Sequence, residues 1–440
     1  MLNARIFEPI RRMESGCLIL ALLFASGLSF SENPGKAEVS YRLTAIEVQG
    51  LRHLTKDRVI AASGLNVGQF SRKSDFETSV EKLGSSGLFN HLSYSYQCSA
   101  TGCNLQFEVS ENEQLIPIRF DNFVWFPEDQ LLTMLESRLP LFTGRLPLGG
   151  KLPHEVSDAL RTILEERKIS GDISYVQVMR TDGQADSYLY RVDRHPVRIR
   201  SVEFPGAAET DIAALESASK PLIGGPYLRS KTAPQAVSAL LPIFLARGYL
   251  KAQLGDPRTT VVEDGSETWI DLRLPVSAGA RFNLSSVEWT GNTVLASKQL
   301  EALLHLKMND PVDAIQLARD LETIEKLYGT KGYLYARVYP SSTLDDIQHS
   351  VSYELNVIEG DLYRMGDLLL HGLDAEATKK MTAQWQMKKG APYDNSYLSR
   401  FFSLIYRDVG LGVSYQVIPK QSVNSEDKTV SVALQFLPKS

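Results

Sequence analysis

Residues 281–363 read RFNLSSVEWTGNTVLASKQLEALLHLKMNDPVDAIQLARDLETIEKLYGTKGYLYARVYPSSTLDDIQHSVSYELNVIEGDLY, and this stretch contains one complete structural unit. Its opening run alternates apolar and polar residues up to Gly291-Asn292, which is typical of a half-buried strand ended by a turn. We expect a helix over Leu295 to Leu306. Asn309-Asp310-Pro311 should end it, because proline resists helix continuation and asparagine tolerates left-handed backbone.

A second helix is predicted from Asp313 to Gly329, because apolar residues recur there every three or four positions. Two alternating strands should follow, Tyr333 to Tyr339 and Val351 to Val357, with the polar run Ser341 to Ser350 as the loop between them. The predicted order is therefore strand, helix, helix, strand, strand.

The residues that end these elements recur at regular spacing along the chain, which predicts a repeat. The glycine after the second helix recurs as Gly87, Gly171, Gly248, Gly332 and Gly410, at spacings of 84, 77, 84 and 78 residues. The residue that ends the first strand recurs in step as Gly50, Asn122, Gly206, Gly291 and Gly372. We therefore expect five repeats, at 41–112, 115–196, 197–279, 280–361 and 362–438. The second is the least regular, because Leu139 to Leu152 inserts a segment with Pro and Gly between its helices.

Residues 1–31 read as an export signal, because three arginines precede the apolar run Cys17 to Phe30. That run of 14 residues is shorter than the ~20 that a transmembrane helix needs. We expect a cleaved signal peptide, with a retained membrane anchor as the alternative. Cys17 lies at the start of the run, whereas a lipid-modified cysteine would follow it.

The composition argues against nucleic acid as a partner. The chain has 440 residues and a formal net charge of −5, without the clustered basic excess of a phosphate-binding surface. No other apolar run approaches membrane length. Five repeats of about 80 residues fit the size of small domains.

Cys98 and Cys103 flank four residues at the end of a predicted hairpin. We predict a disulfide there, which suits an oxidising compartment outside the cytoplasm. A pair of metal ligands is the competing interpretation, but two thiols without a second Cys or His pair make a poor zinc site. Two free thiols are the remaining alternative.

No catalytic, metal or cofactor site is predicted. The seven histidines are spread over the chain without metal-binding spacing, and Ser217-Ala-Ser-Lys220 matches the Ser-x-x-Lys form at a frequency expected by chance. The sequence contains no nucleophile-elbow motif, no phosphate-binding loop and no dinucleotide-binding fingerprint. A hydrolase remains as the last alternative.

The first repeat carries motifs that resemble a POTRA domain. They are Ile46-Glu-Val-Gln-Gly50-Leu-Arg-His-Leu-Thr55, Gly64-Leu-Asn-Val-Gly68-Gln-Phe70, Leu83-Gly-Ser-Ser-Gly87-Leu-Phe89 and Phe107-Glu-Val-Ser-Glu111. Repeat 4 resembles the same family through Gly332-Tyr333 and Val357-Ile-Glu359-Gly360. POTRA arrays form the periplasmic arms of outer-membrane barrel assembly proteins of the BamA and TamA type, and of related secretion and plastid-import pores. The resemblance covers residues 41–438.

The resemblance implies an α+β fold of tandem β-α-α-β-β repeats. Each would be a three-stranded sheet covered on one face by two helices, in an elongated multidomain array. Members of the BamA type continue into a membrane barrel, whereas this sequence stops shortly after the strand Val430 to Phe436. We therefore expect a binding scaffold without insertion activity, located in the periplasm at the outer membrane.

Strand addition at open sheet edges is the binding mode that such repeats would use. By resemblance, the candidate edge strands are His91 to Gln97, Ile173 to Met179, Leu250 to Asp256, Tyr333 to Tyr339 and Gly412 to Ile418. The alternative is that these edges are solvated and bind nothing. Tyr333, Tyr335 and Tyr415 are expected to be core or hairpin contacts.

The expected partners are unfolded outer-membrane proteins and a separate outer-membrane barrel or lipoprotein. A scaffold for cell division or secretion, with its N-terminal segment retained as an anchor, is the first alternative.

Overall fold

The computed structural model describes residues 40–404 and 415–438. The expected export signal 1–31, Gly410 and Gly412 lie outside the described residues. The chain divides into two compact bodies. The first contains residues up to Ser85 together with Phe89–Glu111, and the second contains Ser86–Leu88 and the chain from Asn112 onward.

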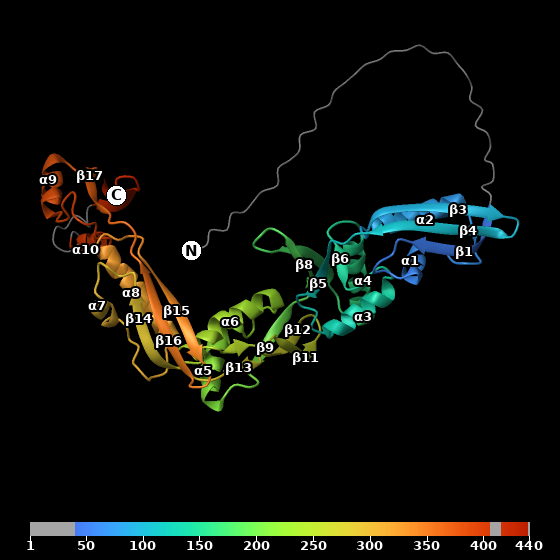
Figure 1. Ribbon diagram of the computed structural model, residues 1–440, viewed down its shortest axis with the longest axis horizontal. Helices are drawn as coiled ribbons and strands as arrows, with labels where there is room; N and C mark the ends of the chain where they lie inside the picture. The colour runs from blue at the N-terminus through green and yellow to red at the C-terminus, as the bar shows by residue number, and fades with distance from the viewer. Residues whose placement is uncertain (1–39, 405–414, 439–440) are drawn as a thin grey trace, which may run out of the picture. The chain divides into compact units, whose positions relative to one another are not determined.

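The first body holds repeat 1. Its elements are β1 (Tyr41–Gln49), α1 (Lys56–Ser63), β2 (Phe70–Ser71), α2 (Lys73–Ser85), β3 (Phe89–Ser99) and β4 (Gly102–Glu111). The strand order is β2-β1-β4-β3, in which β1 is parallel to β4 and the long hairpin β3–β4 is antiparallel (Figure 1). Alternate residues of β4 are buried because only one face of the sheet is covered. On that face, Phe76 of α2 packs against Tyr94 and Tyr96 of β3.

The second body holds repeats 2 to 5. Repeat 2 consists of β5 (Leu115–Phe120), α3 (Glu128–Arg138), β6 (Arg145–Pro147), α4 (Leu152–Glu166), β7 (Asp172–Met179) and β8 (Ala185–Asp193). Repeat 3 consists of β9 (Val197–Glu203), α5 (Glu209–Ser219), the 3-10 helix η1 (Lys220–Leu222), α6 (Arg229–Leu245), β10 (Gln253–Leu254), β11 (Arg258–Asp264), β12 (Thr268–Arg273) and β13 (Val276–Ser277).

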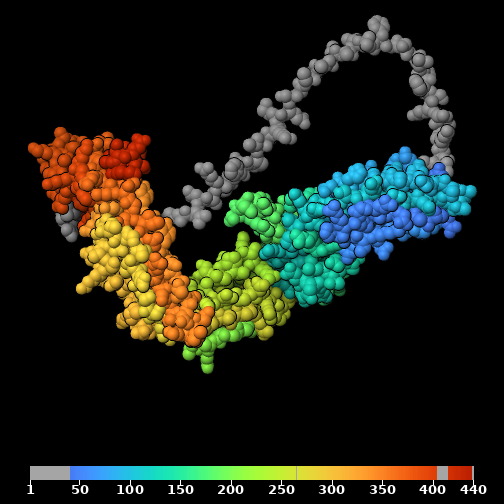
Figure 2. Space-filling view, in the orientation of Figure 1, coloured from blue at the N-terminus to red at the C-terminus, as the bar shows by residue number. Residues whose placement is uncertain are grey.

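Repeats 4 and 5 are simpler. Repeat 4 consists of β14 (Asn283–Thr290), α7 (Ser297–Glu301), α8 (Ala314–Thr330), β15 (Arg337–Asp345) and β16 (Ser350–Ile358). Repeat 5 consists of β17 (Arg364–His371), α9 (Ala375–Gln384), α10 (Tyr397–Leu404), β18 (Tyr415–Asn424) and β19 (Thr429–Pro438). Figure 2 shows the yellow to orange atoms of repeat 4 gathered in one block, as expected for packing that is local in sequence.

The predicted α+β class and the order strand, helix, helix, strand, strand are confirmed. In every repeat the first strand lies parallel to the second strand of a hairpin, and the two hairpin strands are antiparallel. In repeat 3 the short strands β10 and β13 form a separate antiparallel pair. A parallel pair needs a long crossover, and the two helices supply it. Buried side chains from the strands and helices form a separate core in repeats 3, 4 and 5.

The prediction of three strands in every sheet was wrong for repeats 1 and 2. There the segment between the helices adds a short fourth strand, β2 or β6, antiparallel to the first strand. In repeats 3, 4 and 5 the same place is marked by isolated bridges to Pro226, Pro311 and Pro392. The stretch Leu139 to Leu152 is therefore an extended form of a connection that all five repeats share.

Helix α8 begins where the sequence predicts it, with Asp313 as its N-cap and Asn309 in the left-handed region at φ 64°. The preceding helix is shorter than expected, because α7 ends at Glu301 and not at Leu306. The buried carboxylate of Asp320 accepts the backbone N–H of His305 at 2.7 Å, which holds the chain in a non-helical path.

Two predicted edge strands were placed too early. The segment starting at Leu250 contains only the short β10, the long edge strand being β11, and β15 begins four residues after Tyr333. The expected loop Ser341 to Ser350 is mostly strand, since β15 continues to Asp345. Its residues are polar because an edge strand is exposed, and the sequence pattern does not distinguish this from a loop.

The recurring glycines that end the first strands are required by steric contacts. A Cβ atom on Gly291 would lie 2.3 Å from the carbonyl oxygen of Val357, and the residue has φ +74°. Gly50, Gly206 and Gly372 face the same kind of contact with the last strand of their repeats. Asn122, at the same position in repeat 2, contacts the last strand through its side chain. Its amide nitrogen donates to Val192 O and its amide oxygen accepts Val192 N–H, both at 2.9 Å.

The glycine after the second helix meets the next repeat. Gly332 has φ +95°, its carbonyl accepts the N–H of Tyr363 at 2.8 Å, and a Cβ atom would lie 2.6 Å from the carbonyl oxygen of Tyr363. Gly248 accepts the N–H of Phe282 in the same way. Gly248 and Gly332 therefore mark places where one repeat begins to contact the next.

Candidate functional site: open sheet edges

The edge of each sheet formed by the first strand is closed at its beginning by the loop between the helices. In repeat 4, Leu284 N–H donates to Asp310 O and Asn309 N–H donates to Leu284 O, both at 2.9 Å. Repeat 5 repeats this pattern, with Met365 bonded to Ala391 O and to Gly390 N–H. The loop therefore occupies backbone groups that would otherwise be free to pair with another strand.

The opposite edge is open. The strands β3, β7, β11, β15 and β18 each pair with one neighbour in their sheet and form its outer boundary. Such a strand presents backbone N–H and C=O groups on its outer side. Side chains take two of them, because Ser157 Oγ donates to Ile173 O of β7 at 3.2 Å and Val338 N–H of β15 donates to Glu325 Oε1 at 3.0 Å. Because each of these strands belongs to a different sheet, the edges form separate candidate sites.

The predicted site residues within the described ranges lie in two kinds of place. His91 and Gln97 are exposed on β3, and Tyr339 and Ile418 are exposed on β15 and β18. Leu250, Asp256 and Tyr333 precede the long edge strands of repeats 3 and 4.

Tyr335 and Tyr415 make the kind of contact expected of them. Tyr335 makes an edge contact with Tyr363 of the next repeat, and Tyr415 with Phe436 of its own hairpin.

Sequence reasoning missed two features of these edges. The exposed apolar residues Val176, Val178 and Met179 lie together on β7. Pro340 and Pro419 lie inside β15 and β18, opposite Leu355 and Leu434 of the last strands. The two prolines are 79 residues apart, so the repeat spacing could have revealed their equivalence.

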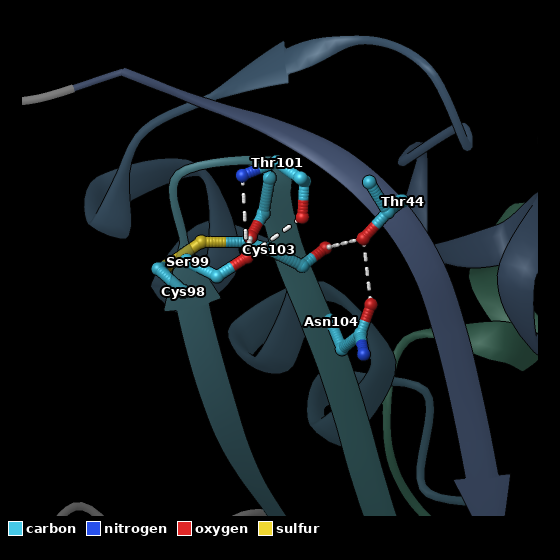
Figure 3. The surroundings of a disulfide bond; sticks show 7 residues. Thr44, Cys98, Ser99, Thr101, Cys103 and Asn104 are labelled. Carbon is cyan, nitrogen blue, oxygen red and sulfur yellow. Dashed lines mark hydrogen bonds between the residues drawn. A yellow bond between two sulfur atoms is a disulfide. The ribbon is translucent and has the colours of Figure 1, made fainter.

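The hairpin β3–β4 is cross-linked at its tip. Cys98 and Cys103 are opposite each other in the strand register and form a disulfide with a Cα–Cα distance of 4.0 Å (Figure 3). Beside it, the hydroxyl of Thr44 on β1 donates to Cys103 O at 3.0 Å and bonds Asn104 Oδ1 at 2.6 Å. The disulfide and Thr44 together hold the end of the edge strand β3 to the rest of the sheet.

Replacing both cysteines by alanine should destabilise the first body by about 2 kcal/mol, because the unfolded chain gains the freedom of the short closed loop. Thermal unfolding followed by circular dichroism, with and without reductant, would measure the effect. Reductant should lower the melting temperature of the wild type and leave the double variant unchanged. Equal behaviour of the two proteins in reductant-free buffer would contradict a stabilising disulfide.

In repeats 1 and 4, a glutamate at the end of the last strand binds the backbone of the turn that follows the first strand. The carboxylate of Glu111 accepts the backbone N–H groups of Arg52, His53 and Leu54 at 2.9–3.0 Å. Glu359 accepts those of Thr293 and Val294, both at 2.7 Å. Both glutamates belong to the POTRA-like motifs of the sequence, Phe107 to Glu111 and Val357 to Gly360.

Burial by itself would raise the pKa of Glu111, but the backbone N–H donors of Arg52, Leu54 and His53 outweigh it and lower the pKa below its usual 4.5. A depressed folded-state pKa means that the carboxylate stabilises the fold above about pH 4.5. This contribution is lost as the pH falls through the folded-state pKa.

Glu111→Gln should therefore cost about 1–2 kcal/mol at neutral pH, because a charged acceptor of several N–H groups is removed. The difference from the wild type should shrink at a second, acidic pH below the depressed pKa of Glu111, where the wild-type carboxyl is also protonated. Urea unfolding at the two pH values would measure both effects. Glu108→Gln is the matched control, because Glu108 is exposed on the same strand. An equal loss in the control would contradict the role of the buried carboxylate.

The described residues do not assemble a catalytic or metal-binding cluster. Ser217 and Lys220 are both exposed at the end of α5. His53 and His305 each contact one carboxylate, Glu111 and Asp320. Within 40–404 and 415–438, no group of three or more His, Cys, Asp and Glu side chains could hold a metal ion. In the same ranges, every helix is too short or too polar to cross a membrane.

Comparisons with known proteins give the family of repeat 4. The family described as "POTRA: Surface antigen variable number repeat" matches residues 282–360. A protein of Treponema pallidum (strain Nichols), named as an outer membrane protein assembly factor, is 19% identical over 192 residues. The alignment covers 41% of this chain and 23% of that protein, so the chain spans less than a quarter of that relative's length.

Solved structures of similar domains are also found. The crystal structure of POTRA domains 3–5 of BamA from Haemophilus influenzae is 21% identical and has a TM-score of 0.41. The match covers 55% of this chain and 96% of that one. The N-terminal domain of Omp85 from Thermosynechococcus elongatus is 16% identical with a TM-score of 0.24, over 56% of this chain and 100% of that one.

Proposed function

We propose that this chain of tandem POTRA domains is a non-catalytic periplasmic scaffold that binds clients or partners by strand addition during outer-membrane protein assembly. One observation carries the proposal. In each described repeat the first-strand edge is occupied at its start by the inter-helix loop, and the hairpin edge is left open. An extended segment can therefore pair at one defined edge of each repeat.

Strand addition suits a receptor for many unfolded clients. Backbone N–H and C=O groups are the same in every extended segment, so the pairing itself is tolerant of sequence. Selectivity then comes from the side chains beside the edge, which alternate between the two faces of the sheet. Clients destined for a membrane sheet carry apolar residues at every second position, which matches this geometry.

The relatives support the location and the partner class. The relative from Treponema pallidum is named for outer membrane protein assembly, and one of the similar structures is part of BamA. We infer that this chain is exported to the periplasm and works at the outer membrane, together with an outer-membrane assembly protein or lipoprotein. A pull-down from detergent-solubilised envelope would identify that partner.

Site-specific photo-crosslinking in cells tests the proposed function. A photoreactive residue at Val176 on β7 should capture outer-membrane proteins or their assembly partners, because this position lies on an open edge. The matched control is Lys326, which is exposed on helix α8 and not on an edge strand, and should capture far less. A crosslinked pool without outer-membrane clients or partners would contradict the proposal.

A further inference from the structure

The five open edges differ in whether a strand can be added to them. Proline has no N–H, and in sheets it is confined to edge strands, strand ends and bulges. Pro340 and Pro419 lie in the middle of β15 and β18. Adding a strand outside either one would turn it into a central-strand proline, so the edges of repeats 4 and 5 are poor acceptors.

The edges of repeats 1 and 3 have other obstacles, although Val262 of β11 is 38% exposed. On β3, Tyr94 and Tyr96 pack toward Phe76 of α2, so the alternate positions on the open face are the polar Ser95 and Gln97. On β11, the pairing register shifts between Val261 and Glu263. Bulges and charged residues are devices that prevent edge pairing.

The edge of repeat 2 contains no proline, and its register shift lies at the end of the strand, between Val178 and Met179. Strand β7 keeps a continuous register from Asp172 to Val178. Val176 and Val178, on the same face because they are two residues apart, are 59% and 36% exposed. Exposed valines beside free backbone groups form the apolar edge that natural proteins normally avoid.

A cleft of about 460 Å³ lies beside this edge, within the second body. Val178 and Leu189 of repeat 2 line one side, and Ala233 and Pro234 of helix α6 line the other. A residue added directly opposite Val178 would have its Cβ atom ~5 Å away, which places its side chain at the mouth of the cleft.

The charges around the cleft neutralise one another. Arg119 pairs with Asp186 at 3.3 Å, and Arg229 pairs with Glu128 at 3.2 Å and with Asp256 at 3.4 Å. A charged occupant would have to break one of these pairs, whereas an apolar side chain leaves them intact. The charge pattern therefore favours an uncharged, apolar occupant.

We infer that β7 is the edge that receives a client strand, and that the cleft beside α6 takes one of its apolar side chains. The client is an extended segment of an unfolded outer-membrane protein with an apolar residue at every second position. This inference rests on the proposed function. It assigns client binding to one of the five open edges, that of β7.

The test uses the exported full chain and a dye-labelled synthetic peptide of about 10 residues that alternates valine and serine. Its twin carries N-methyl groups on alternate residues, which remove the N–H donors of one edge and leave the side chains unchanged. Fluorescence anisotropy should show the plain peptide binding at least about tenfold more tightly than its twin. If neither peptide binds, the proposed function itself is overturned.

Two variants locate the binding edge. Val178→Lys should weaken binding of the plain peptide about tenfold, because a charge enters the apolar surface beside β7. Leu369→Lys is the matched control, since Leu369 is 48% exposed on β17 of repeat 5 and should have no effect. If Val178→Lys binds the plain peptide as the wild type does, the assignment to β7 fails while strand addition stands.

A gain of binding tests the role of the prolines. Pro340→Val restores an N–H to β15 and should add a second peptide site per chain, measured by titration at saturating peptide. An unchanged stoichiometry would overturn the argument that proline closes this edge. Because this variant adds a function, a loss of folding cannot imitate the expected result.

Discussion

Gly50→Ala is expected to destabilise the first body by more than about 3 kcal/mol. We expect this to be the largest loss of stability from any glycine-to-alanine substitution in repeat 1. Gly50 has φ +88°, and a Cβ atom there would lie 2.0 Å from the carbonyl oxygen of Val109. The methyl group must displace the last strand, β4, or force the turn after β1 to open. Urea unfolding of the wild type and the variant would measure the loss.

Gly68→Ala is the control that separates the contact from backbone strain. Gly68 has a similar φ of +95°, but nothing lies within 4 Å of the Cβ position. This variant should cost only about 1–2 kcal/mol, the penalty for a side chain in the left-handed region. Equal losses in the two variants would show that the carbonyl of Val109 is not what excludes a side chain at Gly50.

Asp121→Ala should cost about 2–3 kcal/mol, because Asp121 caps a helix of the next repeat. Helix α6 has no side-chain cap of its own and no acidic residue in its first turn. Asp121, only 4% exposed, accepts Ser230 N–H at 2.8 Å and bonds Ser230 Oγ at 3.1 Å. Its carboxylate supplies the negative charge that the positive end of the helix dipole favours.

Differential scanning calorimetry would measure this effect. In the wild type, repeats 2 and 3 should unfold together, because the cap couples them. Asp121→Ala should lower the transition and separate the two repeats, while Asp121→Asn should retain part of the coupling through its remaining oxygen. Asp129→Ala, at an exposed position in the first turn of α3, is the control for loss of charge alone. A control that melts as low as Asp121→Ala would contradict the capping role.

The sequence predicts the repeat well because its markers have local causes. A glycine that must adopt positive φ, such as Gly291 at +74°, cannot be replaced by another residue without strain. The start of α8 is equally local, because Asp313 accepts the N–H of Gln316 three residues away. Such signals can be read without knowing the tertiary structure.

The edge strands were misplaced because packing in a turn imitates a strand pattern. Tyr333 N–H bonds Tyr328 O and Ala336 N–H bonds Tyr333 O, so the residues after the helix form two turns. Ala336 is buried in the core of the repeat, which gives the segment alternating apolar residues. The true edge strand is polar because it is exposed, so its sequence reads as a loop.

The candidate site was only partly visible in the sequence. The prolines Pro340 and Pro419 are plain in the printed sequence, but only the strand register places them on open edges. The cleft beside β7 combines Val178 of repeat 2 with Pro234 of repeat 3. No local periodicity reports a contact between residues so far apart.

The sequence by itself determined the five-fold recurrence, the order of helices and strands, and the glycines that end them, because each depends on backbone conformation within a few residues. Only the tertiary structure decided which sheet edge is closed, which is open, and how one repeat caps the helix of the next. The contact of Asp121 with Ser230 spans 109 residues. Such a contact exists only after independent segments have folded and packed, so it leaves no periodic trace in the chain.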